Sequence, residues 1–282
     1  MRGLADLLRE TYRVNRDDAG LLHKIRYFAL DMDGTVYFDE TWIPGAREFL
    51  RKLEETGRKY CFMTNNSSKG MDQYIDKLHR MGLDIDLETQ MVSSGAATID
   101  YLKREHPGKS VFLFGNRVLK DEFEAKGIRL AEENPDLIVT AFAQEFDYKD
   151  LSVLCDLLSR GMPFIATHPD YVCPTKQYAC GFMPDIGALH AFIKAATKRE
   201  PEVIIGKPKG EIIRYALKTM GASAEETAVV GDRLYTDVRS GVDNGLTGIF
   251  VLSGEGTLHD IETMGVVPTL TFDSVEEMIP LL

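Results

Sequence analysis

The chain has 282 residues, which suggests two domains or one large one, and its 44% hydrophobic and 27% charged residues are typical of a globular protein with a full-sized core. The formal net charge of −11 at pH 7 disfavours nonspecific binding to nucleic acid or to an acidic membrane surface, so a site for anionic substrates would need local cations. No apolar run in the sequence approaches the length of a membrane span.

Cysteine usage indicates a reducing compartment. Cys61, Cys155, Cys173 and Cys180 form no CxxC pair, which disfavours a zinc site, and a disulfide framework is disfavoured in a chain of this length. We therefore expect reduced thiols and a cytoplasmic protein. Residues 1–24 are charged and interrupted by polar side chains, which argues against a signal peptide.

The first predicted elements are a short amphipathic helix over residues 4–8 and a buried parallel strand over the apolar residues 27–30. The strand runs into Asp31 and Asp33, and Gly34 indicates that it ends there. Ligands of an open parallel sheet bind at the carboxyl ends of its strands, and two carboxylates brought together there repel unless a cation or a shared proton lies between them. A solvated turn is the alternative for this stretch taken alone.

Strands and helices then alternate along the chain, which predicts parallel sheets with helical crossovers. The pattern predicts strands at residues 59–63, 91–93, 111–114, 137–141, 164–167, 203–205, 227–230 and 248–252. It predicts helices over residues 44–57, up to 82, through 101–106, near 118–126 and 151–160, from 185, up to 220 and around 275–281.

Four of the predicted strands end in polar clusters. These clusters are Asp31 with Asp33; Thr64, Asn65 and Asn66; Lys207; and Asp232 followed by Asp237. If the four strands lie side by side in one sheet, the clusters converge on one rim. Crowded carboxylates bind hard divalent metals such as Mg²⁺, and lysine, threonine and asparagine can hydrogen-bond phosphate oxygens. Phosphoryl transfer requires this set of groups.

Each cluster also has an ordinary interpretation. Residues 64–66 are typical of a strand-to-helix turn, and Asp237 would suit the first turn of a following helix. Lys207 would be a solvated lysine at a helix start, although a cation is unfavourable at that end of the helix dipole. All four clusters, in this order at strand ends, favour a functional site.

The four clusters resemble the four sequence motifs of the haloacid dehalogenase superfamily. The matching segments are Asp31-Met32-Asp33-Gly34-Thr35, Thr64-Asn65-Asn66, Gly206-Lys207-Pro208 and Gly231-Asp232-Arg233-Leu234-Tyr235-Thr236-Asp237. Motif details and cap position are similar to subclass IIA, the NagD-like and p-nitrophenyl-phosphatase-like phosphatases of sugars or nucleotides. The resemblance extends from about Tyr27 to the C-terminus and includes residues 166–170 and 251–254.

The resemblance implies a catalytic set of Asp31, Asp33, Thr64 and Lys207. Asp31 would be the nucleophile that forms an aspartyl-phosphate, and Asp33 would protonate the leaving oxygen and then activate the hydrolytic water. Thr64 and Lys207 would hold phosphate oxygens. An aspartate at position 33 also separates this pattern from that of the dehalogenases, which disfavours carbon–halogen cleavage.

The resemblance also implies Mg²⁺ as cofactor. Its ligands would be the side chains of Asp31 and Asp232 and the backbone carbonyl of Asp33, with Asp237 supporting the metal through a water or through Lys207. The substrate-binding residues implied in this way are Gly34, Thr64, Asn65, Asn66 and Lys207, together with Asp170 and Tyr171 of the cap.

The implied fold class is α/β, with a Rossmann-like parallel-sheet core of residues 1–107 and 196–282, in which residues 1–24 are an N-terminal extension. An inserted α/β cap of the subclass II type would comprise residues 108–195. Such a cap would close over the leaving group and exclude water, with residues 168–181 as its substrate-facing loop. His168, a lone histidine in that polar loop, is expected to be solvated.

We therefore expect a Mg²⁺-dependent phosphatase that hydrolyses small phosphate monoesters, such as sugar phosphates or nucleotide monophosphates, through an aspartyl-phosphate. The alternatives are a phosphotransferase that uses the same intermediate and a catalytically weak metabolite-binding protein. The expected partner is a small phosphorylated metabolite, with no nucleic acid and no membrane. Relatives that dimerise through the cap also favour a homodimer.

Overall fold

The computed structural model describes residues 19–67, 71–175 and 177–282. The helix expected at residues 4–8 therefore lies outside the described residues. The chain divides into two compact units. The first unit holds the described chain up to Thr64 together with Ile75–Val92 and Lys207–Leu282, and the second unit holds Asn65–Tyr74 and Ser93–Gly206. Across the described ranges, no helix combines the length and the apolarity needed to cross a membrane.

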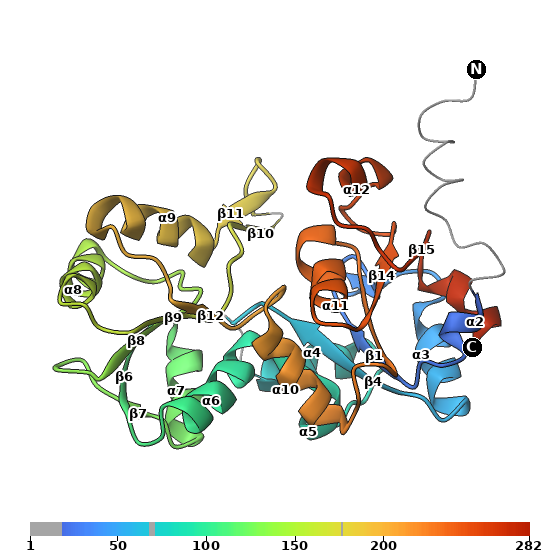
Figure 1. Ribbon diagram of the computed structural model, residues 1–282, viewed down its shortest axis with the longest axis horizontal. Coiled ribbons are helices and arrows are strands. Elements are labelled where there is room, and N and C mark those ends of the chain that lie inside the picture. Colours follow the sequence, from blue (N-terminus) through green and yellow to red (C-terminus); the bar gives the residue numbers. More distant parts are fainter. Residues whose placement is uncertain (1–18, 68–70, 176) are drawn as a thin grey trace. The chain divides into compact units, whose positions relative to one another are not determined.

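A six-stranded sheet forms the centre of the first unit, with strand order β15-β14-β13-β1-β4-β5. Figure 1 labels β1, β4, β14 and β15 of this sheet. Its strands are β1 (Tyr27–Leu30), β4 (Lys59–Thr64), β5 (Met91–Ser93), β13 (Thr227–Gly231), β14 (Thr247–Val251) and β15 (Leu270–Phe272). The pairs that β1 forms with β4 and β13, and those that β14 forms with β13 and β15, are parallel. A small antiparallel hairpin, β2 (Tyr37–Phe38) and β3 (Thr41–Trp42), follows β1.

Helices and short helical turns flank the sheet of the first unit. They are α2 (Ala19–Leu22), α3 (Ala46–Glu55), α5 (Leu87–Gln90), α10 (Gly210–Met220), the π turn η2 (Leu234–Val238), α11 (Arg239–Asp243), α12 (Leu258–Met264) and the 3₁₀ segment η3 (Val275–Leu281). Helix α4 (Met71–Arg80) begins in the second unit and ends in the first. The core forms because β1 is buried through Phe28, Ala29 and Leu30, and the Phe28 ring packs edge-on against Phe49 of α3, with ring centroids 6.0 Å apart.

The second unit contains a five-stranded parallel sheet, with strand order β12-β9-β8-β6-β7. Its strands are β6 (Ser110–Phe114), β7 (Arg129–Leu130), β8 (Leu137–Thr140), β9 (Phe164–Ala166) and β12 (Val203–Ile204). Its helices are α6 (Ser94–Glu105), α7 (Arg117–Ala125), α8 (Tyr148–Ser159) and α9 (Ile186–Thr197), and an antiparallel hairpin joins β10 (Val172–Pro174) to β11 (Phe182–Pro184).

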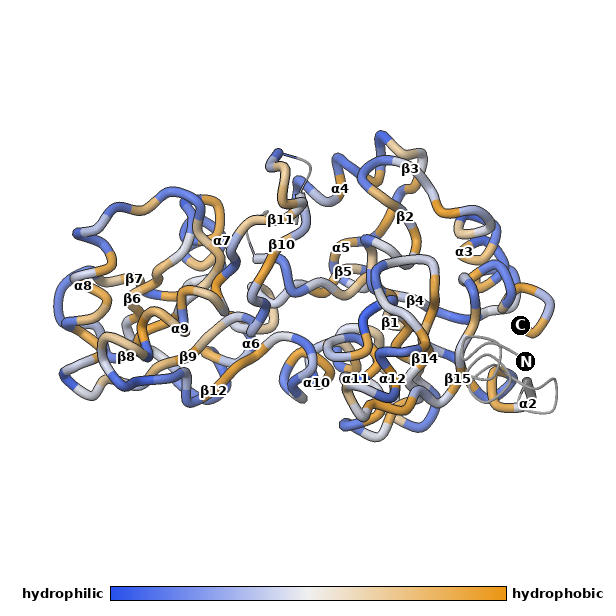
Figure 2. The backbone as a smooth tube through the Cα atoms, turned by 90° about the horizontal axis from the view of Figure 1, so that it is seen from above, coloured by the Kyte–Doolittle hydropathy of each residue, from blue (hydrophilic) through white to orange (hydrophobic). Residues whose placement is uncertain are grey.

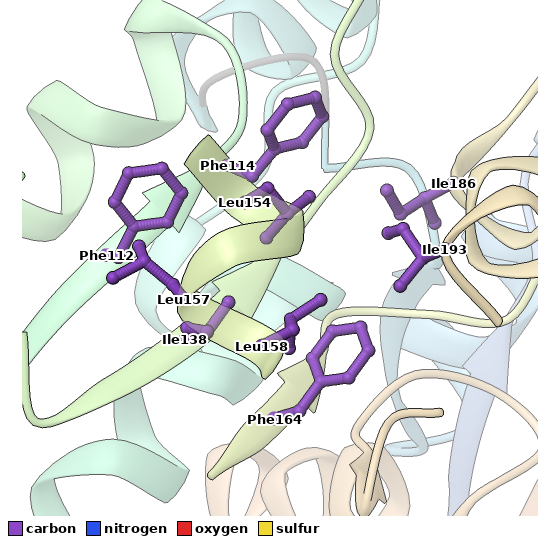
Figure 3. Packing of buried hydrophobic residues seen from close by; sticks show 9 residues of the cluster. All are labelled: Phe112, Phe114, Ile138, Leu154, Leu157, Leu158, Phe164, Ile186 and Ile193. Atoms are coloured by element: carbon purple, nitrogen blue, oxygen red, sulfur yellow. The ribbon is translucent and has the colours of Figure 1, made fainter. Parts of the chain in front are cut away.

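The second unit has a hydrophobic core of its own, in which α8 and α9 pack against the sheet. Figure 3 shows its buried side chains, which are Phe112, Phe114, Ile138, Leu154, Leu157, Leu158, Phe164, Ile186 and Ile193. In Figure 2, hydrophobic residues run through the strands of each unit and hydrophilic residues recur along the helices. This pattern is typical of a parallel sheet that is covered by amphipathic helices.

The predicted alternation of strands and helices is confirmed, but one predicted strand belongs to the other sheet and the buried strand β15 was not predicted. The strand predicted at residues 203–205 forms as β12, but it pairs with β9 in the sheet of the second unit. The condition that the four motif strands lie side by side in one sheet is therefore not met. Three of them, β13, β1 and β4, are neighbours in the first sheet, whereas Lys207 follows β12 at the point where the chain re-enters the first unit.

Candidate active site

The register of the first sheet brings three motif strands to one level at their carboxyl ends. Leu30 of β1 pairs with Val230 of β13 on one side and with Phe62 of β4 on the other. Asp31 therefore follows β1 one residue before the level of Asp232, which follows β13, and of Thr64, the last residue of β4. The backbone N–H of Asp31 donates to the carbonyl of Val230 at 2.9 Å, which continues the ladder to the rim.

Lys207 joins two of the predicted acids. Its ammonium group is buried and donates to Asp31 Oδ1 at 2.5 Å, to Asp237 Oδ1 at 2.6 Å and to the carbonyl oxygen of Met63 at 3.0 Å. Burial alone would lower the pKa of Lys207, but the Asp237 and Asp31 carboxylates outweigh it and hold the pKa above its usual range. The lysine therefore stays charged beside Asp31, whose side chain is 15% exposed.

Asp232 is the third carboxylate of the cluster and is almost fully buried. The backbone N–H of Glu255 donates to its Oδ2 at 2.8 Å, and the Thr35 hydroxyl donates to its Oδ1 at 3.5 Å. Burial, together with the nearby charges of Asp31 and Asp237, raises the pKa of Asp232. A bound cation would relieve this clustering of negative charge.

Asp237 lies in the π turn η2 and is fully buried. Besides Lys207, it accepts a hydrogen bond from the backbone N–H of Arg233 at 3.1 Å. Burial and the Asp31 charge raise its pKa, and the Lys207 ammonium opposes that rise. The main role of the Asp237 side chain is therefore to hold Lys207 in place, and stabilising the first turn of a helix is secondary.

The donor set of this cluster fits a hard divalent cation. Asp31, Asp232 and Asp237 each offer an oxygen, and the three oxygens lie within 4.8 Å of one another. Mg²⁺ prefers oxygen ligands and takes one or two protein carboxylates. Asp31 and Asp237 both contact Lys207, but Asp237 is fully buried and its second oxygen accepts from the Arg233 N–H, so Asp31 and Asp232 are the two carboxylates best suited to hold the ion.

Gly34 makes close packing around Asp232 feasible. Its backbone φ of 90° is one that residues with a side chain rarely adopt, and a Cβ at this position would overlap the Asp232 carboxylate. Its carbonyl oxygen accepts a hydrogen bond from the Ser253 hydroxyl at 2.7 Å. The backbone at Gly34 is thus fixed between Asp232 and the loop after β14.

We expect Gly34→Ala to weaken metal binding as well as stability. The strained φ should destabilise the fold by about 1–3 kcal/mol, and the displaced Asp232 carboxylate should weaken the binding of a divalent cation at least about tenfold. Gly57→Ala is the matched control, because Gly57 has a φ of 71° and open space where its Cβ would stand. Thermal melting and Mg²⁺ titration test this. An unchanged Mg²⁺ requirement in Gly34→Ala would show that Asp232 is not constrained by this contact.

Asp33 and Thr64 stand at the same rim in different environments. The Asp33 side chain is 66% exposed, with its Oδ1 3.9 Å from Lys77 Nζ, and its backbone bridges to Tyr37. Thr64 is 8% exposed at the end of β4, one residue after the Met63 carbonyl that accepts from Lys207. The Asp33 carboxylate is thus exposed, whereas that of Asp237 is fully buried.

The other predicted substrate residues belong to the second unit. The Asn65 side-chain amide donates to both carboxylate oxygens of Asp170, at 3.0 and 3.2 Å. Asn66 is half-buried, and Tyr171 is 66% exposed beside the β10–β11 hairpin. Whether these residues bind substrate stays a prediction.

The expectation that His168 is solvated is wrong. The ring is fully buried, with Nδ1 2.8 Å from the Thr167 hydroxyl and Nε2 3.0 Å from Asp185 Oδ1. Burial opposes the charged form, but Asp185 and Asp170 raise the pKa of His168. The residue therefore joins β9 to the start of α9 within the second unit.

Sequence reasoning gave no role to several residues that shape the site. Thr35, Ser253 and Glu255 hold Asp232 or Gly34 in place, and Lys77 faces Asp33. Thr35 and Ser253 stand inside segments that carry the family resemblance, so their positions were available as a signal. Glu255 contributes a backbone N–H, which any residue but proline supplies, and its side chain type therefore gave no signal.

Comparison with known proteins first defines the class. Residues 28–129 match the family described as haloacid dehalogenase-like hydrolase, and residues 204–278 match one described as HAD-hydrolase-like. The acid sugar phosphatase of Staphylococcus aureus (strain MRSA252) is 32% identical over 259 residues, which cover 92% of this chain and 98% of that protein. The chain therefore belongs to the haloacid dehalogenase-like hydrolases.

Solved structures then narrow the assignment within that family. A 4-nitrophenylphosphatase from Thermotoga maritima superposes with a TM-score of 0.87 at 41% identity, covering 92% of this chain and 98% of that one. NagD from Escherichia coli K-12 superposes with a TM-score of 0.81 at 33% identity, covering 90% and 98%. These similarities place the enzyme among the phosphatases of the family.

Proposed function

We propose that this protein is a Mg²⁺-dependent phosphatase of small phosphate monoesters that works through an aspartyl-phosphate on Asp31. The observation that carries the proposal is the joint geometry of Asp31 and Asp232, which follow the adjacent strands β1 and β13, and of Lys207, whose ammonium group contacts Asp31. A nucleophilic carboxylate, a buried cation and a metal-binding carboxylate are together at one rim, which is what phosphoryl transfer needs.

In the first half of the proposed reaction, an Asp31 carboxylate oxygen attacks phosphorus and the bond from phosphorus to the ester oxygen breaks. The leaving oxygen takes a proton from Asp33 and departs as an alcohol. In the second half, Asp33 accepts a proton from a water that attacks the same phosphorus, which releases inorganic phosphate and restores Asp31. Asp33 suits both transfers because its side chain is exposed.

The remaining residues would hold the phosphoryl group. Lys207 and Thr64 would contact its oxygens, and Gly34, Asn65 and Asn66 would line the same position. Mg²⁺, held by Asp31, Asp232 and the Asp33 carbonyl, would neutralise phosphate charge when bound. Asp237 would act through Lys207, which it contacts at 2.6 Å.

We further propose that residues 108–195 act as a cap on a core of residues 1–107 and 196–282. Its loop over residues 168–181 would supply Asp170 and Tyr171 to the leaving group.

The names of the relatives favour sugar phosphates and 4-nitrophenyl phosphate as substrates, with nucleotide monophosphates as a further class. A cytoplasmic location agrees with the four free cysteines, and a homodimer through the cap is proposed from the family resemblance.

Removal of the metal should abolish turnover. After treatment with a chelator, phosphate release from a panel of sugar phosphates, nucleotide monophosphates and 4-nitrophenyl phosphate is expected to fall at least about 100-fold, and added Mg²⁺ should restore it. The folded state of the stripped protein is checked by circular dichroism. Full activity in the chelated protein would refute the metal requirement, and no release under any condition would favour a metabolite-binding protein. Phosphate that appears on an added alcohol would indicate phosphotransfer.

A further inference from the structure

Lys77 occupies an unusual position on α4. The buried positions of this helix and of the residue just after it recur at the spacing of one helical face, at Tyr74, Lys77, Leu78 and Met81. Lys77 is 9% exposed and stands within this otherwise apolar face. Lysine is rarely buried without a compensating group. In the part of the chain that the structure describes, the other buried lysine is Lys207, which stands in the active site.

The Lys77 ammonium is directed at the segment that carries Asp33. Its Nζ lies 3.9 Å from the ring centroid of Tyr37 and 3.9 Å from Asp33 Oδ1. The face of the Tyr37 ring attracts the ammonium group. The Asp33 carboxylate is too distant for a hydrogen bond, so it interacts with the ammonium group through charge. The Lys77 ammonium group therefore interacts with both the Asp33 carboxylate and the neighbouring Tyr37 ring.

Tyr37 is itself tied to the backbone around Asp33. Its carbonyl oxygen accepts from the N–H of Gly34 at 2.9 Å, and Tyr37 forms an isolated bridge with Asp33. Trp42 packs edge-on against the Tyr37 ring and donates from its indole nitrogen to the Met81 carbonyl at 3.0 Å. The hairpin after β1 is thus fixed to the end of α4, which holds Lys77 in register with Asp33.

We infer that Lys77 is a positioning residue for Asp33, fixing its carboxylate toward the leaving oxygen of the ester. The inference rests on the proposed function, in which Asp33 is the general acid. The Asp33 side chain is 66% exposed, and a carboxylate in such a position needs a constraint if it is to hold one orientation. A buried cation held over a fixed ring supplies that constraint from α4.

Two substrates with different leaving groups can distinguish a positioning role of Lys77 from a purely structural role. Proton donation matters most when the departing oxygen is basic and least when it is a stable phenolate. A variant with a misdirected Asp33 should therefore lose activity toward phenyl phosphate and keep it toward 4-nitrophenyl phosphate, a substrate of nearly the same shape. A variant with less folded protein loses both activities in proportion, so the ratio of the two kcat/KM values is unaffected.

The test compares Lys77→Met with Lys77→Arg, Asp33→Asn and Arg80→Met. Arg80 is the matched control because it lies on the same helix and pairs with Glu40 at 2.7 Å on an exposed surface. In Lys77→Met, kcat/KM for phenyl phosphate should fall by about 10- to 100-fold and that for 4-nitrophenyl phosphate by less than about threefold. Asp33→Asn should show the same pattern more strongly, Lys77→Arg should retain most of the wild-type ratio, and Arg80→Met should leave it unchanged.

Three outcomes overturn the inference while the proposed function stands. The first is an unchanged ratio in Lys77→Met when Asp33→Asn shifts it, and the second is an equal shift in Lys77→Arg and Lys77→Met. The third is an equal loss for both esters, confined to KM, which would mean that Lys77 contacts the phosphate itself. A wild-type protein with no activity toward either ester refutes the proposed function instead. Because any folded fraction reports the ratio, partial misfolding of Lys77→Met leaves the test decisive.

Discussion

Asp31→Asn is expected to lower kcat for 4-nitrophenyl phosphate by on the order of 10⁴-fold or more, because removal of a covalent nucleophile leaves only the residual catalysis of the binding groups. The amide has nearly the shape of the carboxylate and still accepts a hydrogen bond from Lys207, which lies 2.5 Å from Asp31 Oδ1. What it lacks is the negative oxygen that attacks phosphorus in the proposed reaction. Steady-state phosphate release at saturating Mg²⁺ measures the loss.

An exposed aspartate provides the control for Asp31→Asn. Asp243 of α11 belongs to the same unit and pairs with Arg239 at 3.4 Å on the surface, so Asp243→Asn should keep wild-type turnover. Circular dichroism and thermal melting establish that both variants are folded. Turnover by Asp31→Asn at the wild-type rate would assign the nucleophile to another group.

Lys207→Met should damage both stability and catalysis. The lysine compensates Asp31 and Asp237, and its loss leaves these carboxylates beside Asp232 with no ammonium between them. Breaking a buried ion pair on one side typically destabilises a protein by about 3–5 kcal/mol. If Lys207 contacts the phosphoryl oxygens as proposed, the loss of its charge should lower kcat by about 10²–10³-fold. Urea unfolding and steady-state kinetics measure the two effects.

Lys209 separates the effect of the buried charge from that of lysine loss in general. It is exposed, lies two residues further along the chain and precedes α10, so Lys209→Met should change the free energy of unfolding by less than about 0.5 kcal/mol. A Lys207→Met protein as stable and as active as Lys209→Met would contradict the account of the cluster. Mg²⁺ should stabilise Lys207→Met more than the wild type if the ion takes over part of the lost positive charge.

Most strand positions were predictable because a buried strand is a short apolar run with a local signature, whereas β15 has only three residues, one of them a threonine, and was missed. Tyr27–Leu30 and Thr227–Gly231 have this signature, and each is followed by the polar residues that mark its end. Sheet membership was less predictable, because β12 has only two residues and its pairing with β9 depends on the whole of the second unit. The local pattern correctly placed Lys207 just after a strand. It did not indicate to which of the two sheets that strand belongs.

The parts of the site that depend on distant contacts escaped prediction. His168 has polar neighbours in sequence, yet its burial follows from Asp185, seventeen residues later. In the sequence, Lys77 only interrupts an apolar helix face. Its contact with the Tyr37 ring of the preceding hairpin is visible only in the folded structure. Glu255 acts through a backbone N–H, which leaves no mark on residue type. Such contacts are set by tertiary packing and have no local sequence pattern.

The central claim is that phosphate passes through a covalent bond to Asp31. Wild-type enzyme turning over 4-nitrophenyl phosphate with Mg²⁺ is quenched rapidly and reduced with borohydride, which converts an aspartyl-phosphate to homoserine, and the peptide that contains residue 31 is examined by mass spectrometry. We expect homoserine at position 31, and none in enzyme quenched without substrate. Active turnover with residue 31 unmodified, and homoserine at another aspartate instead, would contradict the account.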